Sequence, residues 1–134
     1  MTLNPATIFG EDMAFDGTSL WRADITAGLV QQIDPSNGSI IFSFDPGFSP
    51  LGVAWDGSHL WVSEFNGFAG NELIKQFTPA GVATGNQFHT PLAIQAAGGL
   101  AFDTTDNTLW IGTFAQVFHS TTTGTLLGSF NVPG

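Results

Sequence analysis

The sequence predicts an all-β protein made of three copies of one four-stranded unit. The string Ala-Phe-Asp-Gly-Thr-Ser-Leu-Trp at residues 14–21 returns as Ala-Trp-Asp-Gly-Ser-His-Leu-Trp at 54–61 and, in a longer form, at 101–110. Short apolar strands and turns that recur with a period of about forty residues are typical of β-propeller blades. The fold class that we predict is therefore three four-stranded β-propeller blades.

The first copy shows four strands separated by residues that favour turns. Asp16-Gly17 supplies the first hairpin, because both residue types tolerate the positive backbone angles of such turns. The segment Asp-Pro-Ser-Asn-Gly at residues 34–38 supplies the turn before the last strand, and Pro46-Gly47 ends the unit. The four strands are expected at residues 13–15, 20–23, 29–33 and 40–44.

The second and third copies repeat this plan. Trp61 follows Trp21 by forty positions and Trp110 follows Trp61 by forty-nine. Most of the added residues fall within 91–98, and we expect a loop insertion there that leaves the core undisturbed. We place the blades at about residues 6–49, 50–91 and 92–134. The remaining strands are expected at residues 53–55, 60–63, 72–77, 82–88, 100–102, 109–112, 116–119 and 126–132.

Composition excludes several classes of partner. The 134-residue chain carries 11 Asp and Glu against 2 Lys and Arg, for a formal net charge of -9. Such a surface repels nucleic acid and anionic membranes. Because Cys is absent, there are no disulfides or thiolate metal ligands. No segment reaches the ~20 apolar residues of a membrane span. We expect a soluble protein, and its compartment stays open.

Three blades are too few to close a ring, since propellers have about 4 to 8 blades. The two terminal blades would each leave an apolar sheet face uncovered. A head-to-tail homodimer would supply six blades and cover every face. The alternatives are three blades cut from a longer propeller, or a designed repeat. Arg22 stands where the other copies have Val62 and Ile111; it either pairs across the seam or is solvated.

The repeat resembles a known group of propellers. The strings that carry the resemblance are residues 15–21, the turn at 34–38, and Ser-Phe-Asp-Pro-Gly at 43–47. They are similar to bacterial propeller repeats of the NHL and lactonase-like group, and in particular to repeats of secreted proteins with PEP-CTERM sorting tails. The resemblance implies the fold and a secreted origin. Propellers host many functions, so it assigns none.

Asp24 and Glu64 are the best candidates for a site, because they occupy equivalent positions at the end of the second strand of their blades. The resemblance implies that this position lies near the mouth of the central channel. Clustered carboxylates bind a hard cation such as calcium, or raise each other's pKa values. The alternative is that both are solvated or accept hydrogen bonds from the next loop. Thr113 is the counterpart in the third copy.

Other candidates are weaker. His59, His89 and His119 occupy different repeat positions, so we do not expect them to converge on a metal. Phe65 and Phe68 lie in a longer loop that either binds a carbohydrate or peptide, or folds over the channel as a plug. The turn residues Asp16, Asp34 and Asp56 are expected to accept local amide hydrogen bonds.

We therefore predict a non-catalytic scaffold or binding module that assembles into a closed six-bladed ring as a homodimer. Its ligand, a small molecule or carbohydrate, would contact Asp24, Glu64, Phe65 and Phe68. The alternative is a metal-dependent lactonase-like or lyase-like enzyme in which Asp24 and Glu64 hold calcium at the channel.

Overall fold

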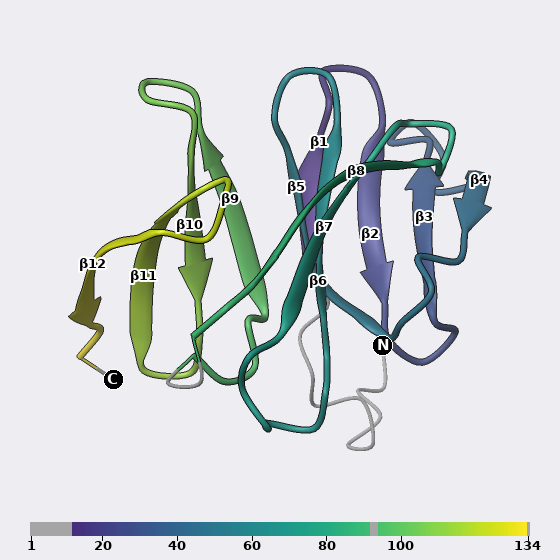
Figure 1. The fold of residues 1–134 in the computed structure, drawn as a ribbon. Helices are drawn as coiled ribbons and strands as arrows, with labels where there is room; N and C mark the ends of the chain where they lie inside the picture. The colour runs from purple at the N-terminus through teal and green to yellow at the C-terminus, as the bar shows by residue number, and fades with distance from the viewer. Residues whose placement is uncertain (1–11, 92–93, 134) are drawn as a thin grey trace.

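The computed structural model describes residues 12–91 and 94–133, which form three four-stranded antiparallel sheets (Figure 1). In each sheet, strands that follow one another along the chain are hydrogen-bonded neighbours. Among the described residues, no helix has the length and apolarity to cross a membrane. The start of the first predicted blade, residues 6–11, lies outside the described residues.

All twelve predicted strands are present. The ends differ most at the strand expected to begin at residue 53, which begins at Pro50. Proline suits the first position of a strand, where no ladder hydrogen bond needs its missing N–H. The strands are β1 (Met13–Phe15), β2 (Leu20–Asp24), β3 (Leu29–Ile33), β4 (Ile40–Phe44), β5 (Pro50–Trp55), β6 (Leu60–Glu64), β7 (Leu73–Phe77), β8 (Ala83–His89), β9 (Gly99–Asp103), β10 (Thr108–Gly112), β11 (Gln116–Thr121) and β12 (Leu126–Asn131).

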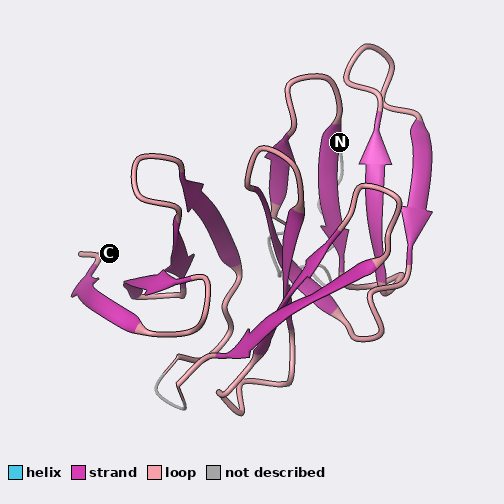
Figure 2. Cartoon of the chain, turned by 45° about the horizontal axis from the view of Figure 1, so that its top comes forward, coloured by secondary structure: helices cyan, strands magenta, loops and turns pink. Residues whose placement is uncertain are grey.

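The sheets stand side by side as successive blades. The first strand of the middle blade, β5, contacts both β1 and β9, so these three strands lie innermost. The fourth strands β4 and β12 lie at opposite outer edges (Figures 1 and 2). Each blade thus runs from an inner first strand to an outer fourth strand, which is the arrangement of a propeller.

Two hydrophobic cores fill the spaces between neighbouring blades. Trp21 of the first blade packs with Val53 and Leu60 of the second. Trp61 of the second blade packs with Leu109 and other residues of the third. These two tryptophans therefore have a structural role, because each fills the interface with the following blade.

The tryptophans also hold the hairpin turns. In each blade the carboxylate that opens the first hairpin accepts a hydrogen bond from the indole N–H five or seven residues later, at 2.8 to 3.1 Å. The other carboxylate oxygen accepts backbone N–H groups of the turn itself. The predicted turn role of Asp16 and Asp56 is confirmed, and the indole bond is a second role that sequence patterns did not indicate. The three pairs are Asp16–Trp21, Asp56–Trp61 and Asp103–Trp110.

The insertion before the third blade differs from our expectation. Ile94, Ala96 and Ala97 are buried, and Ile94 and Ala97 join the core between the second and third blades. The insertion is a loop, as expected, but it contributes side chains to the core instead of lying outside it. Apolar side chains in the insertion cover surface that a shorter connection would leave open to water, and this burial stabilises the inserted loop.

Candidate functional site

Asp24 and Glu64 lie where the sequence placed them, as the last residues of β2 and β6. Asp24 accepts a hydrogen bond from the Ala27 N–H of the following loop at 3.0 Å, and Glu64 accepts one at 3.4 Å from the N–H of Leu73, the residue at which that loop meets β7. Asp24 also lies 4.0 Å from the guanidinium of Arg22. Both carboxylates therefore support their own loops, which was the alternative role weighed for them.

Glu72 is a buried carboxylate that sequence reasoning missed. Its side chain has no exposed surface, and its two oxygens accept the N–H groups of Ala96 and Ala97 in the insertion. Burial raises the pKa of the Glu72 carboxyl, and the nearby charge of Glu64 raises it further. The structure thus brings together Glu64 and Glu72. A departure from the repeat was the available signal, since the equivalent residues Gly28 and Ala115 carry no carboxylate.

The histidines do not gather. His59 contacts the Asp56 turn, His89 lies against the backbone of Asn71, and His119 stacks on Trp110 with ring centroids 4.0 Å apart. Within residues 12–91 and 94–133, no group of three His, Asp or Glu side chains could hold a metal ion. The three histidines therefore lie in separate environments.

Phe65 and Phe68 form an aromatic cluster with a residue of the next blade. Their rings meet edge to face at 5.3 Å, and Phe68 stacks on Phe114 at 5.8 Å. Phe114 follows Thr113, just as Phe65 follows Glu64, so equivalent loops of two blades meet here. Phe114 is 80% exposed and Phe68 has a positive φ of 69°. The cluster joins the loop ends of the second and third blades.

Asp12 lies among the inner strands. Its carboxylate accepts the backbone N–H groups of Val53 in β5 and Leu100 in β9, at 3.0 and 2.9 Å. Burial raises the pKa of the Asp12 carboxyl, while these hydrogen bonds act in the opposite direction. By the strand registers, Asp12 stands at the position that Gly52 and Gly99 occupy in the other blades. One side chain therefore connects the inner strands of all three blades.

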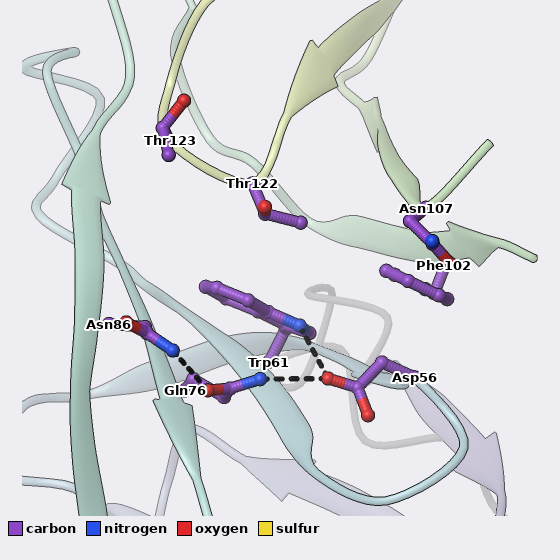
Figure 3. Close-up of a pocket in the computed structure, with 8 residues that line it drawn as sticks. All are labelled: Asp56, Trp61, Gln76, Asn86, Phe102, Asn107, Thr122 and Thr123. Carbon is purple, nitrogen blue, oxygen red and sulfur yellow. Dashed lines mark hydrogen bonds between the residues drawn. The ribbon is translucent and has the colours of Figure 1, made fainter.

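A pocket of about 280 Å³ lies between the second and third blades, near their hairpin turns (Figure 3). A row of hydrogen bonds fixes its floor: Asn86 donates to Gln76, and Gln76 and the Trp61 indole donate to Asp56, at 2.8 to 3.0 Å. Asp56 also accepts turn N–H groups, and these donors lower the pKa of its carboxyl against the effect of burial. The other lining residues are Phe102, Asn107, Thr122 and Thr123.

Two departures from the repeat distinguish this pocket from the interface between the first and second blades. Asn86 stands at the position of Phe42 in the first blade, and Phe102 stands at the position of the larger Trp55. Between the first and second blades, Trp55 packs against the hydrophobic core and Phe42 lies against Phe44. The interface between the second and third blades thus has the amide of Asn86 where the other interface has the ring of Phe42, and the smaller ring of Phe102 where the other has Trp55.

These three sheets define part of a β-propeller. Solved structures with a similar fold include a protein of unknown function from Bacteroides caccae, at a TM-score of 0.65 and 12% identity over 100% of this chain and 49% of that chain. Glutaminyl cyclase from Myxococcus xanthus has a TM-score of 0.68 and 14% identity over 93% of this chain and 51% of that chain. A gluconolactonase from Xanthomonas campestris has a TM-score of 0.59 and 21% identity over 87% and 44%.

The chain spans about half the length of these similar structures. No family model matches the sequence, and no curated protein matches it. The likeness is one of fold.

Proposed function

We propose that this chain is half of a closed β-propeller, that a second copy completes the ring head to tail, and that the ring is a non-catalytic binding scaffold. The observation that carries the proposal is the exposure of equivalent tryptophans. Trp21 and Trp61 are 0% and 2% exposed beneath the blade that follows each of them, whereas Trp110 of the last blade is only partly buried. The last blade thus presents the same apolar face without a following blade.

The first blade has the complementary face. Leu60 and Leu109, on the faces that meet the preceding blade, are fully buried. Leu20 at the equivalent position remains partly exposed. Large exposed apolar residues concentrate in the same two blades, and such patches mark association sites. They include Met13, Phe15, Ile40 and Ile41 in the first blade, and Leu126, Leu127 and Phe130 in the third.

A second copy suits both open faces. The open face of the last blade is equivalent to the face that meets the following blade in the first two blades, and the open face of the first blade is equivalent to the face that meets the preceding blade in the other two. Faces of these two kinds pack together twice within the chain. Two copies related by a twofold axis place each open face against its mate, so the assembly closes without leaving a face exposed.

The ligand of this scaffold would enter the pocket between the second and third blades. At about 280 Å³ the pocket is smaller than the ~300–1,000 Å³ of sites for drug-sized molecules. Its carboxylate, amide and hydroxyl groups beside aromatic rings suit a small polar molecule such as a single sugar. The surface of Asp24, Glu64, Phe65 and Phe68 remains a second place for a ligand, at the opposite ends of the strands.

Absolute mass by light scattering across a dilution series tests the assembly. We expect 28.2 kDa, twice the 14.1 kDa of one chain, at all but the lowest concentrations. A soluble species of one chain's mass at every concentration would refute the proposal.

The competing function is a metal-dependent enzyme of the lactonase or lyase type. It is favoured by the equivalent placement of Asp24 and Glu64, and by the proximity of the Glu64 and Glu72 charges. In the closed ring, the carboxylates of two copies would provide oxygen ligands of the kind calcium prefers. Calorimetric titration with calcium separates the two functions. Heat and a rise in melting temperature that are both lost in Glu64→Gln would support the enzyme, and neither is expected for the scaffold.

A further inference from the structure

Each blade joins its third and fourth strands by the same kind of turn. A glycine in this turn has a positive φ, of 75°, 83° and 93° in the three blades. Its N–H donates to the carbonyl of the residue that opens the turn, at 2.8 to 3.2 Å. Such φ values favour glycine strongly over other residues. The three glycines, Gly38, Gly81 and Gly124, are therefore equivalent in conformation, although the first turn is one residue longer.

Within the chain, two of these turns sit on an aromatic ring of the preceding blade. A Cβ at Gly81 would lie 2.7 Å from the Cβ of Phe44, and one at Gly124 would lie 3.0 Å from the ring and 3.1 Å from the Cβ of Phe88. No side chain larger than hydrogen fits such a contact without movement. Phe44 and Phe88 are 9% and 7% exposed as a result. This glycine-on-phenylalanine contact is the joint between the outer parts of neighbouring blades.

The last blade carries the same phenylalanine, and no turn among the residues that the structure describes covers it. By strand register, Phe130 is the equivalent of Phe44 and Phe88, yet it is 54% exposed. The ring of Trp110 packs beside Phe130, as the equivalent tryptophans do in the other two blades. The tryptophan and phenylalanine centroids of the three blades lie 6.5, 6.2 and 6.4 Å apart. The receiving half of the joint is thus preformed on the open face.

The first blade carries the glycine turn of this contact, at Gly38, and no described phenylalanine lies beneath it. Within residues 12–91 and 94–133, a Cβ at Gly38 would meet no atom within 4 Å, although the same glycine position is filled closely in both other blades. The described part of the chain therefore has, at one end of the row of blades, a turn with no phenylalanine beneath it and, at the other end, a phenylalanine with no turn above it.

We propose that the ring closes through this joint: the Gly38 turn of each copy seats on Phe130 of the other copy. The inference rests on the proposed assembly of two copies and specifies its seam. The occupant of the exposed Phe130 face is then a second copy of this chain, because that copy supplies the turn that covers the equivalent phenylalanine twice within one chain. In a twofold ring the contact occurs twice.

Cysteine cross-linking tests the joint, and the native chain contains no Cys that could interfere. Gly38→Cys and Phe130→Cys are made as two separate proteins. A disulfide needs Cβ atoms about 3.5–4.5 Å apart, a distance that a small shift from the internal joints provides. Under mild oxidation we expect a 28.2 kDa product, twice the 14.1 kDa chain, when the two proteins are mixed and allowed to exchange subunits. Neither protein alone should form it, because a head-to-tail seam never brings like positions together.

Two controls keep the test interpretable. The double variant Phe44→Cys/Gly81→Cys places the same pair at an internal joint and should form a disulfide within one chain. Ser39→Cys, next to Gly38, replaces Gly38→Cys if the strained turn does not accept a side chain. A native protein of dimer mass whose mixture fails to cross-link, while the internal control succeeds, would overturn the joint and leave the dimer standing. Cross-linking within either single preparation would also overturn it, and a native protein of monomer mass would overturn the dimer itself.

Discussion

The Trp61 indole N–H donates a hydrogen bond to the Asp56 carboxylate at 3.0 Å. This bond joins a residue of the hairpin turn to a residue of the core between two blades. The carboxylate fixes the turn through Ser58 and His59, and the indole fills the interface with the third blade. The geometry of the turn and the packing between the blades are thus linked through the hydrogen bond between these two side chains.

Removing this carboxylate should therefore destabilise the protein. Asp56→Ala leaves the buried Trp61 N–H without its acceptor, and we expect a loss of about 1–3 kcal/mol in the free energy of unfolding. Asp103→Ala removes the equivalent acceptor from Trp110, which is partly exposed and can bond to water. The loss should be smaller there. Urea unfolding measures both, and equal losses in the two variants would contradict this account.

A side chain at Gly81 should disrupt the joint between the first and second blades. The Cβ of Gly81→Ala would lie 2.7 Å from Phe44, and overpacking of this kind costs about 1–3 kcal/mol. The φ strain adds about 1–2 kcal/mol. Gly85→Ala is the matched control, because Gly85 also has a positive φ but no atom within 4 Å of its Cβ position. Thermal unfolding should show Gly81→Ala as the less stable variant, and the reverse order would rule out the steric explanation.

The pH dependence of stability should change when Asp12 is replaced. Burial raises the pKa of Asp12 in the folded state, so ionisation is less favourable there than in the unfolded chain. Its contribution is fully present below the unfolded pKa and is lost as pH rises through the folded pKa. The melting temperature of Asp12→Asn relative to the native protein should therefore increase as pH rises from 3 to 7.

Asp34→Asn is the control with the opposite sign. Hydrogen bonds from Ser36 lower the pKa of Asp34, so its ionised form stabilises the folded protein above the unfolded pKa. This contribution is lost as pH falls through the folded pKa. The melting temperature of Asp34→Asn should fall relative to the native protein over the same rise in pH. A pH trend of the same sign in both variants would contradict these assignments.

Salt should strengthen the proposed dimer. Two chains of charge -9 repel each other, and salt screens that repulsion while it leaves apolar contacts intact. The dissociation constant from the dilution series should fall between low and moderate salt. A constant that rises steadily with salt would indicate ion pairs across the seam. Arg22 is the candidate for such a pair, although it already donates to Gln31 at 3.0 Å within its own chain.

Filling the pocket should abolish ligand binding. Asn86→Phe copies the residue of the first blade at the equivalent position and places a ring where the pocket is polar. We expect saturation-transfer NMR signals from simple monosaccharides with the native protein and none with Asn86→Phe. Thr84→Ala, which removes a hydroxyl bonded to the same Gln76 from outside the lining, should retain them. Signals of equal strength in all three proteins would exclude this pocket as the site.

The repeat in the sequence was sufficient to predict the strands. Alternating apolar residues and Asp-Gly turns act locally, so the bounds of β1, β3 and β4 were predicted correctly. The contacts of residues that depart from the repeat could not be predicted from the sequence. Asp12 and Glu72 bind backbone groups of distant segments, and their partners depend on how the blades are stacked. The burial of Ile94 could not be predicted either, because it follows from the path of an insertion with no counterpart in the other copies.

The Asp12 contact also restricts how such a protein could be built from identical units. If all three blades had the sequence of the first, aspartate would stand at the positions of Asp12, Gly52 and Gly99. The three carboxylates would then lie close together among the inner strands and repel one another. A chain of three second blades would have glycine there, as at Gly52, and the inner N–H groups of Val53 and its equivalents would lose a shared acceptor. An ancestor with three identical blades could therefore not have had this contact. One blade had to diverge from the others before a single carboxylate could bind the inner strands of both other blades.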